Sequence, residues 1–149
     1  MAAAITAGAR TAGATFDLVI IGAGAAGESA AYAGRQSGLR VAIVDRRWFG
    51  GSCPHIACVP SKALLHAAAE HHTRPHGHPW SRASARRDWM VNRAPDAAEP
   101  DDSGHRQGLE DAGAVVHPGT ATIVGRGEVE VRHDGATHRL RAREVVVAV

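Results

Sequence analysis

The chain has no apolar run long enough to cross a membrane, and its N-terminus has no compact hydrophobic block. A membrane span needs about 20 consecutive apolar residues, and a secretory signal needs a shorter apolar segment near the start. Residues 1–15 are instead rich in alanine, glycine and threonine. We therefore predict a disordered extension over residues 1–15, no membrane association and a cytoplasmic location.

Aromatic residues are also scarce, and neither sign of charge is in clear excess. Aromatic side chains make up 4% of the 149 residues, and 17 basic residues face 15 acidic ones, for a net charge of +2. So small a charge gives no electrostatic reason to expect nucleic acid as a partner. With 44% apolar and 21% charged residues, the composition is that of a folded globular chain of one domain.

Cysteine and lysine are the scarcest of the reactive residues. The only two cysteines are Cys53 and Cys58, and the only lysine, Lys62, follows them in the same segment. In the cytoplasm such a cysteine pair is more often redox-active or metal-binding than structural. Zinc bound by Cys53, His55 and Cys58 is the alternative, but the sequence offers no second cluster to complete the four ligands. We therefore predict a redox pair and no metal site.

The spacing of the two cysteines constrains the local backbone. In a regular helix, residues five apart have Cα atoms roughly 8.7 Å apart, whereas a disulfide needs about 4.4–6.8 Å. A bridge between Cys53 and Cys58 therefore requires a distorted segment. Pro54 and Pro60 are consistent with a loop that enters a helix near Cys58. The helix N-terminus at that point should favour the Cys58 thiolate.

A glycine-rich segment lies upstream between two apolar runs. Residues 16–21 are nearly all apolar, which is typical of a strand buried on both faces of a parallel sheet. Gly22-Ala23-Gly24-Ala25-Ala26-Gly27 follows at once, and residues 28–36 have the small side chains of a tightly packed helix. A second apolar strand over 39–44 then ends in Asp45. The order of strand, glycine turn, helix, strand and acid predicts a βαβ unit that binds a dinucleotide.

Each part of this motif has a physical task. Gly22 permits the tight turn, Gly24 lets the backbone approach a pyrophosphate, and Gly27 lets the helix lie close against the strand. The N–H groups and the positive dipole end of the helix attract the phosphates. Asp45 can accept hydrogen bonds from an adenosine ribose, and the two arginines that follow it leave open whether a 2′-phosphate is accommodated.

The rest of the chain divides into a helical part and a β part. Helices are predicted over 61–70, 81–92 and 104–112, with loops over 71–79 and 94–103. Short strands are predicted over 114–117, 120–124, 128–132, 138–141 and 145–149. The fold class is therefore α/β, a Rossmann-like domain with a parallel sheet plus a small β-meander. Because the chain stops on an apolar strand, we expect it to be truncated, or a fragment of a longer chain.

A resemblance to a known family rests on residues 50–62, which read Gly-Gly-Ser-Cys-Pro-His-Ile-Ala-Cys-Val-Pro-Ser-Lys. They resemble the redox-active segment of the FAD-dependent pyridine nucleotide-disulfide oxidoreductases, which include dihydrolipoamide dehydrogenase, mercuric reductase and glutathione-reductase-like enzymes. That pattern runs Gly-Gly-(Thr/Ser)-Cys, four residues, Cys, one residue, Pro-Ser-Lys, and every fixed position is matched. With the glycine motif, the resemblance covers the chain from about Phe16 to its end. His55 and Ala57 depart from it, because the family commonly has Asn and Gly there.

The resemblance implies a cofactor and a role for each reactive residue. FAD would bind at the glycine turn, so the Rossmann-like domain would be an FAD-binding domain, and NAD(P)H would supply electrons in the full-length enzyme. Cys58 would lie against the flavin, Cys53 would exchange with the substrate, and Lys62 would lie near the flavin N5. The substrate would be a small or protein-borne disulfide or a metal ion, and the flow could also run in reverse. The implied cofactor-binding residues are Gly22, Gly24, Ala25, Ala26, Gly27, Asp45, Arg46, Gly51, Ser52 and Lys62.

The resemblance also implies an incomplete enzyme. Residues 16–149 would be the N-terminal portion of the FAD-binding domain, without the NAD(P)-binding and dimerisation domains of the family, whose full-length members form homodimers. We therefore expect this chain alone to bind FAD weakly or not at all and to be inactive. The alternative is a catalytically incomplete nucleotide-binding fragment or interaction module.

Overall fold

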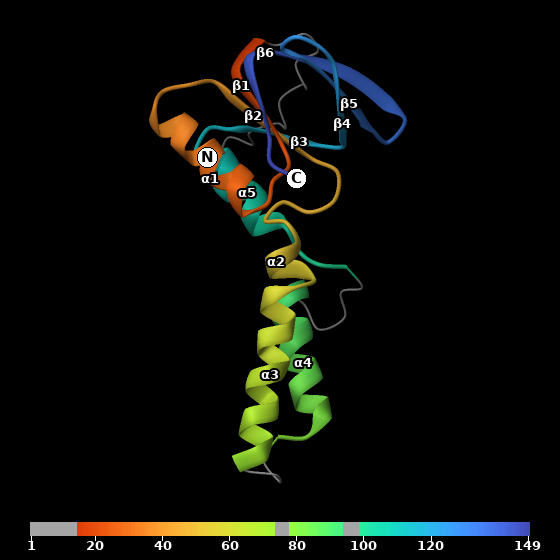
Figure 1. Ribbon diagram of the computed structural model, residues 1–149. Coiled ribbons are helices and arrows are strands. Elements are labelled where there is room, and N and C mark those ends of the chain that lie inside the picture. Colours follow the sequence, from red (N-terminus) through yellow and green to blue (C-terminus); the bar gives the residue numbers. More distant parts are fainter. Residues whose placement is uncertain (1–14, 74–77, 94–98) are drawn as a thin grey trace, which may run out of the picture.

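The computed structural model describes residues 15–73, 78–93 and 99–149, which form a curled six-stranded sheet with helices below it and a helical hairpin that extends away from it (Figure 1). The strand order is β3-β2-β1-β6-β5-β4. The strands are β1 (Thr15–Ile21), β2 (Val41–Asp45), β3 (Val115–Pro118), β4 (Thr120–Gly125), β5 (Glu128–His133) and β6 (Ala136–Val147). The helices are α1 (Ala25–Gln36), α2 (Ser52–His55), α3 (Cys58–Thr73), α4 (Trp80–Asn92) and α5 (Ser103–Asp111). The predicted Rossmann-like α/β fold with a β-meander is confirmed.

The parallel half of the sheet is the predicted βαβ unit. β1 pairs with β2 with Ile20 opposite Ile43, and β2 pairs with β3 with Ile43 opposite Val116. The predicted strands over 16–21 and 39–44 are both present, although the second begins only at Val41. Thr15, the last residue of the predicted disordered extension over 1–15, pairs with Arg141 in the sheet. Residues 1–14 lie outside the described residues.

The last strand differs from the prediction in one respect. We predicted two short strands over 138–141 and 145–149, whereas β6 is one continuous strand over Ala136–Val147. Its first half pairs antiparallel with β5, its second half pairs parallel with β1, and Arg141 has a partner on each side. Arg141, Arg143 and Glu144 lie where β6 passes from one neighbour to the other, and they are solvent-exposed.

Two apolar clusters cover the two faces of the sheet. Ile20 and Ile43 face α1 and α5, where they pack with Phe49 and Leu109. The neighbouring residues along the same strands point to the opposite face and pack against the meander, because side chains alternate along a strand. That second cluster consists of Phe16, Val19, Ala42, Val44, Val129, Val131 and Leu140. Packing on both faces holds β1 and β2 in the centre of the domain.

The helical hairpin is made by α3 and α4, which pack against each other beyond the sheet (Figure 1). Each buries only alanine, with Ala63 and Ala67 on α3 and Ala83 on α4. The predicted helix over 81–92 is confirmed, whereas α3 extends beyond 61–70 at both ends. α3 thus includes the first three residues of the predicted loop over 71–79, and residues 74–77 and 94–98 lie outside the described residues. Throughout the described part of the chain, every helix is too short or too polar to cross a membrane.

Candidate functional site

A cavity of about 520 Å³ opens at the carboxyl ends of β1 and β2. In sheets of this kind, ligands bind beyond the carboxyl ends of the parallel strands. The structure brings six of the predicted cofactor-binding residues to this cavity: Gly22, Gly24, Asp45, Arg46, Gly51 and Ser52. We call it the dinucleotide cleft. Ala25 and Ala26 are exposed at the first turn of α1, beside Gly24, and Gly27 is buried beneath them.

The glycine turn closes the floor of the cleft as the motif predicts. A Cβ atom at Gly27 would lie 1.9 Å from the carbonyl oxygen of Gly22, so only glycine allows α1 to pack this closely against β1. Gly24 differs, because a Cβ atom there would meet nothing within 4 Å. The backbone at Gly24 and the first turn of α1 therefore face open space, which suits the approach of a phosphate to the helix N-terminus.

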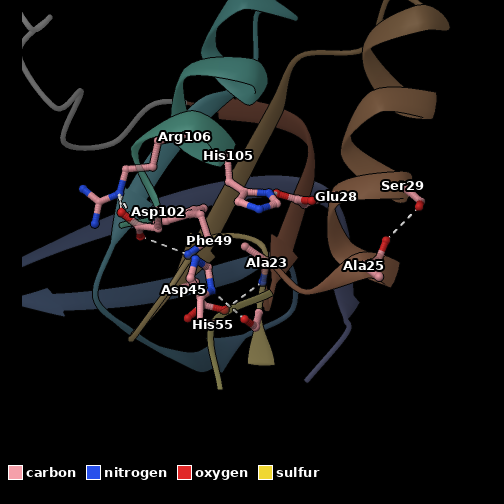
Figure 2. Close-up of polar contacts among 11 residues, drawn as sticks. Ala23, Ala25, Glu28, Ser29, Asp45, Phe49, His55, Asp102, His105 and Arg106 are labelled. Carbon is pink, nitrogen blue, oxygen red and sulfur yellow. Dashed lines mark hydrogen bonds and ion pairs between the residues drawn. The ribbon is translucent and has the colours of Figure 1, made fainter. Parts of the chain in front are cut away.

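Asp45 fixes the shape of the cleft through both of its carboxylate oxygens. Its Oδ2 accepts a hydrogen bond from the Ala23 N–H at 2.8 Å (Figure 2). Its Oδ1 accepts one from the Arg47 N–H at 2.8 Å. The first bond ties the end of β2 to the glycine turn, and the second closes the turn that follows β2. Each oxygen retains a further lone pair, so the predicted contact to a ribose stays a prediction.

The Gly50–Gly51 turn connects the cleft to the cysteines. The Gly50 N–H donates to the Ala23 carbonyl oxygen at 2.8 Å, which seats the turn against the glycine motif. Gly51 has φ +73°, and a Cβ atom there would lie 2.7 Å from the Cα atom of Gly24. α2 begins at the next residue, Ser52, and Cys53 follows it. The Gly-Gly pair before Ser52 and Cys53 is thus a packing requirement of the cleft.

The two cysteines lie together at a break between helices. α2 ends at His55 and α3 begins at Cys58, so the predicted local distortion is confirmed. Both residues are exposed free thiols, and the Cys53 thiol is hydrogen-bonded to Cys58. This hydrogen bond is the largest effect on Cys53 and raises its pKa. Two thiols that interact in this way are candidates for a disulfide, and the bridge itself stays a prediction.

Lys62 lies beside the cysteine pair. It follows Cys58 by one helical turn on α3, so the two side chains share a helix face. Its positive charge lowers the pKa of the Cys53 thiol, but this effect is the weakest of several, and the net result is a raised pKa. The structure therefore groups Lys62 with the cysteines rather than with the residues that line the dinucleotide cleft.

The zinc alternative is not supported by the geometry. His55 is 4% exposed, and its Nδ1 is hydrogen-bonded to the Gly51 carbonyl oxygen at 2.8 Å, whereas both thiols face solvent. Over residues 15–73, 78–93 and 99–149, no group of three or more His, Cys, Asp or Glu side chains is arranged to hold a metal ion.

Sequence reasoning missed several residues of the cleft. Trp48 lines it, and the Arg47 guanidinium lies 3.9 Å above the Trp48 ring. Gly119 and Thr120 line it from the end of β3, where the Gly119 N–H donates to the Asp45 carbonyl oxygen at 2.8 Å. Gly119, between the predicted strands over 114–117 and 120–124, was a usable signal, because the carboxyl ends of parallel strands meet at one edge. Its use required the knowledge that β3 lies beside β2.

Comparisons with known proteins agree with this geometry. A family model described as pyridine nucleotide-disulphide oxidoreductase matches residues 16–149. The chain is 34% identical over 142 residues to dihydrolipoyl dehydrogenase 3 of Pseudomonas aeruginosa, which covers 90% of this chain and 30% of that protein. It is 51% identical over 57 residues to mercuric reductase of Streptomyces lividans, covering 38% of this chain and 12% of that protein.

Among solved structures, the HOCl-induced flavoprotein disulfide reductase RclA from Escherichia coli matches with a TM-score of 0.71 and 26% identity, over 89% of this chain and 27% of that chain. The chain thus spans 30% or less of the length of these relatives. Because the family model covers nearly all of the described residues, the chain belongs to the pyridine nucleotide-disulphide oxidoreductase family.

Proposed function

We propose that this chain is the FAD-binding, thiol-bearing part of an oxidoreductase that passes electrons from NAD(P)H to a disulfide or metal-ion substrate, or in reverse, through Cys53 and Cys58. One observation carries the proposal. The Gly51–Ser52 turn that lines the dinucleotide cleft leads directly into Cys53, whose thiol is hydrogen-bonded to Cys58. A nucleotide site and a thiol pair are therefore adjacent in space as well as in sequence. Thiols of this kind persist in a reducing compartment, which supports a cytoplasmic location.

The cleft fits the adenosine diphosphate half of FAD. Its volume of about 520 Å³ lies in the range of about 300–1,000 Å³ typical of small-molecule sites. The open backbone at Gly24 and the first turn of α1 would hold the pyrophosphate, and Asp45 would hold the ribose. FAD, when bound, would carry the electrons of NAD(P)H to this end of the molecule and return a Cys53–Cys58 bridge to the dithiol.

The chain's own chemistry is thiol–disulfide exchange. In its reducing direction, the Cys53 thiolate attacks one sulfur of a disulfide substrate, and the other sulfur leaves as a thiol. Cys58 then attacks the Cys53 sulfur of this mixed disulfide, which forms the Cys53–Cys58 bridge and releases the second thiol. The two protons of the dithiol end on the two released thiols. Lys62 assists because its charge favours a thiolate nearby.

A single-turnover experiment tests the proposal. The chain is reduced with dithiothreitol, freed of reductant and mixed with glutathione disulfide. We expect two molecules of glutathione to be released per chain, and we expect NADPH with added FAD to sustain no further turnover. If no glutathione is released while the chain still binds ADP, the proposal is wrong and the alternative, a nucleotide-binding module, is supported. Steady NADPH oxidation would instead contradict the expectation that the chain alone is inactive.

A further inference from the structure

We propose that His55 is a positioning residue for Cys53, because its side chain closes the α2 turn that holds the Cys53 thiol against Cys58. The inference rests on the proposed thiol–disulfide function, since it names a residue that sets the geometry of that same pair. In this proposal His55 acts through the α2 turn and takes no part in the exchange.

The first step of the argument is the burial of α2. Of its four residues, His55 is the only buried one, with 4% of its surface exposed. Ser52 and Cys53 are exposed, and so is Cys58 at the start of α3. The contact between the thiol-bearing segment and the body of the domain therefore depends on the His55 side chain, because the exposed side chains around it contribute little packing.

The second step is the hydrogen bond between His55 and Gly51. The His55 Nδ1 lies 2.8 Å from the Gly51 carbonyl oxygen, and a carbonyl oxygen only accepts, so Nδ1–H must donate. The bond closes a loop that contains Ser52, Cys53 and Pro54. Nδ1 carries a proton in this neutral tautomer and also in the protonated ring, so this bond persists whether or not His55 is charged.

The third step is the packing of the ring. The centroid of the His55 ring lies 5.6 Å from that of the Trp48 ring. It lies 5.7 Å from the centroid of the His105 ring, in an edge-to-face arrangement. His105 is fixed in turn, because its Nδ1 lies 2.9 Å from Oε1 of Glu28 on α1 (Figure 2). The titratable and charged groups around His55 are therefore His105 with Glu28, together with Arg93 and Asp101 across a second cavity of about 370 Å³.

The consequence concerns the Cys53 sulfur. A closed α2 turn keeps this sulfur within hydrogen-bonding reach of Cys58, and the same proximity favours formation of the bridge. If the turn opens, the two sulfur atoms separate. The bridge then forms less readily, and Cys53 loses the hydrogen bond that is the largest cause of its raised pKa.

A matched pair of variants isolates the hydrogen bond. In His55→Asn the side-chain nitrogen is attached to Cγ, as Nδ1 is in histidine, so the donor is kept while most of the ring is lost. His55→Leu places a methyl group at the same point and has no donor. Each chain is equilibrated with reduced and oxidised glutathione at several ratios, and the fraction of bridged chain is read from intact mass after acid quenching and alkylation.

We expect the equilibrium constant for bridging in His55→Asn to lie within about twofold of the wild-type value. In His55→Leu it should fall roughly fivefold, which is the effect of one hydrogen bond. Alkylation of Cys53 in His55→Leu should also shift to lower pH. Circular dichroism checks that each variant is folded. If His55→Leu is not folded, His55→Gln replaces it, because the glutamine donor is one bond farther from Cα than Nδ1 is. Equal equilibrium constants in all variants, or equal losses in both, would overturn the role of His55. A wild-type chain that never bridges would overturn the proposed function as well.

Discussion

The Cys53 thiol donates a hydrogen bond to Cys58 across the break between α2 and α3. The bond stabilises the protonated form of Cys53 and is the largest cause of its raised pKa, while the Cys58 backbone N–H and the Lys62 charge act in the opposite direction. This relationship leads to the first prediction.

Cys58→Ala should lower the pKa of Cys53, because it removes the hydrogen bond that raises that pKa and keeps the backbone N–H that lowers it. The rate of Cys53 alkylation by iodoacetamide, followed against pH with the modified residue identified by mass spectrometry, should shift to lower pH. Lys62→Met is the matched control, because loss of its positive charge should shift the profile to higher pH. An unchanged profile in Cys58→Ala would mean that the thiols do not interact in solution.

Gly27→Ala should destabilise the fold, because the new Cβ atom would lie 1.9 Å from the Gly22 carbonyl oxygen. Overpacking of this kind typically costs about 1–3 kcal/mol in the free energy of unfolding. Gly24→Ala is the control, since its Cβ atom meets nothing within 4 Å and its φ is −76°. Urea denaturation should separate the two variants, and calorimetric titration with ADP should show weaker binding by Gly24→Ala. Equal stability of both variants would show that α1 does not pack against the glycine turn in this way.

Asp45→Asn should lower the free energy of unfolding by about 1–3 kcal/mol, because an amide group can accept from only one of the two N–H groups that the carboxylate now binds. The other N–H would face an NH₂ donor. Asp88→Asn on the exposed side of α4 offers a comparison and should change stability by less than about 0.5 kcal/mol. Chemical denaturation measures both, and a loss of the same size in the two variants would rule out the bridging role of Asp45.

Acid should weaken the link between β1 and β2 through Asp17. The Arg40 backbone N–H donates to Asp17 Oδ2 at 2.8 Å, and this bond holds the pKa of the carboxyl below its usual value of 3.8. Because the folded pKa is the lower one, the stabilisation is present above the unfolded pKa and is lost as the pH falls through the folded value. Below about pH 4 the wild-type chain should therefore lose stability more steeply than Asp17→Asn. Parallel losses in thermal unfolding scans at several pH values would argue against this bond.

Local patterns in the sequence were enough to predict the βαβ unit and the thiol pair. The glycine turn and Asp45 act within one short stretch, and the distortion between Cys53 and Cys58 follows from the reach of a disulfide. These features depend on covalent geometry and backbone conformation, which neighbouring residues determine. The family pattern in residues 50–62 then indicated thiol–disulfide chemistry, which stays a prediction.

The features that sequence reasoning missed depend on tertiary contacts. The continuity of β6 follows from its having two different neighbours. The contact between His55 and His105 joins segments on either side of the helical hairpin, and no periodicity signals it. Trp48 likewise joins the dinucleotide cleft only because β2 ends beside the glycine turn.

The most direct test of the proposed redox pair is the intact mass of the chain after equilibration with glutathione. We expect wild type to lose the mass of two hydrogen atoms in a single transition as the glutathione disulfide fraction rises. Cys53→Ser and Cys58→Ser should each gain one glutathione and never lose that mass. A wild-type chain that gains glutathione on both cysteines, with no bridged form at any ratio, would contradict the central claim that Cys53 and Cys58 form a reversible disulfide.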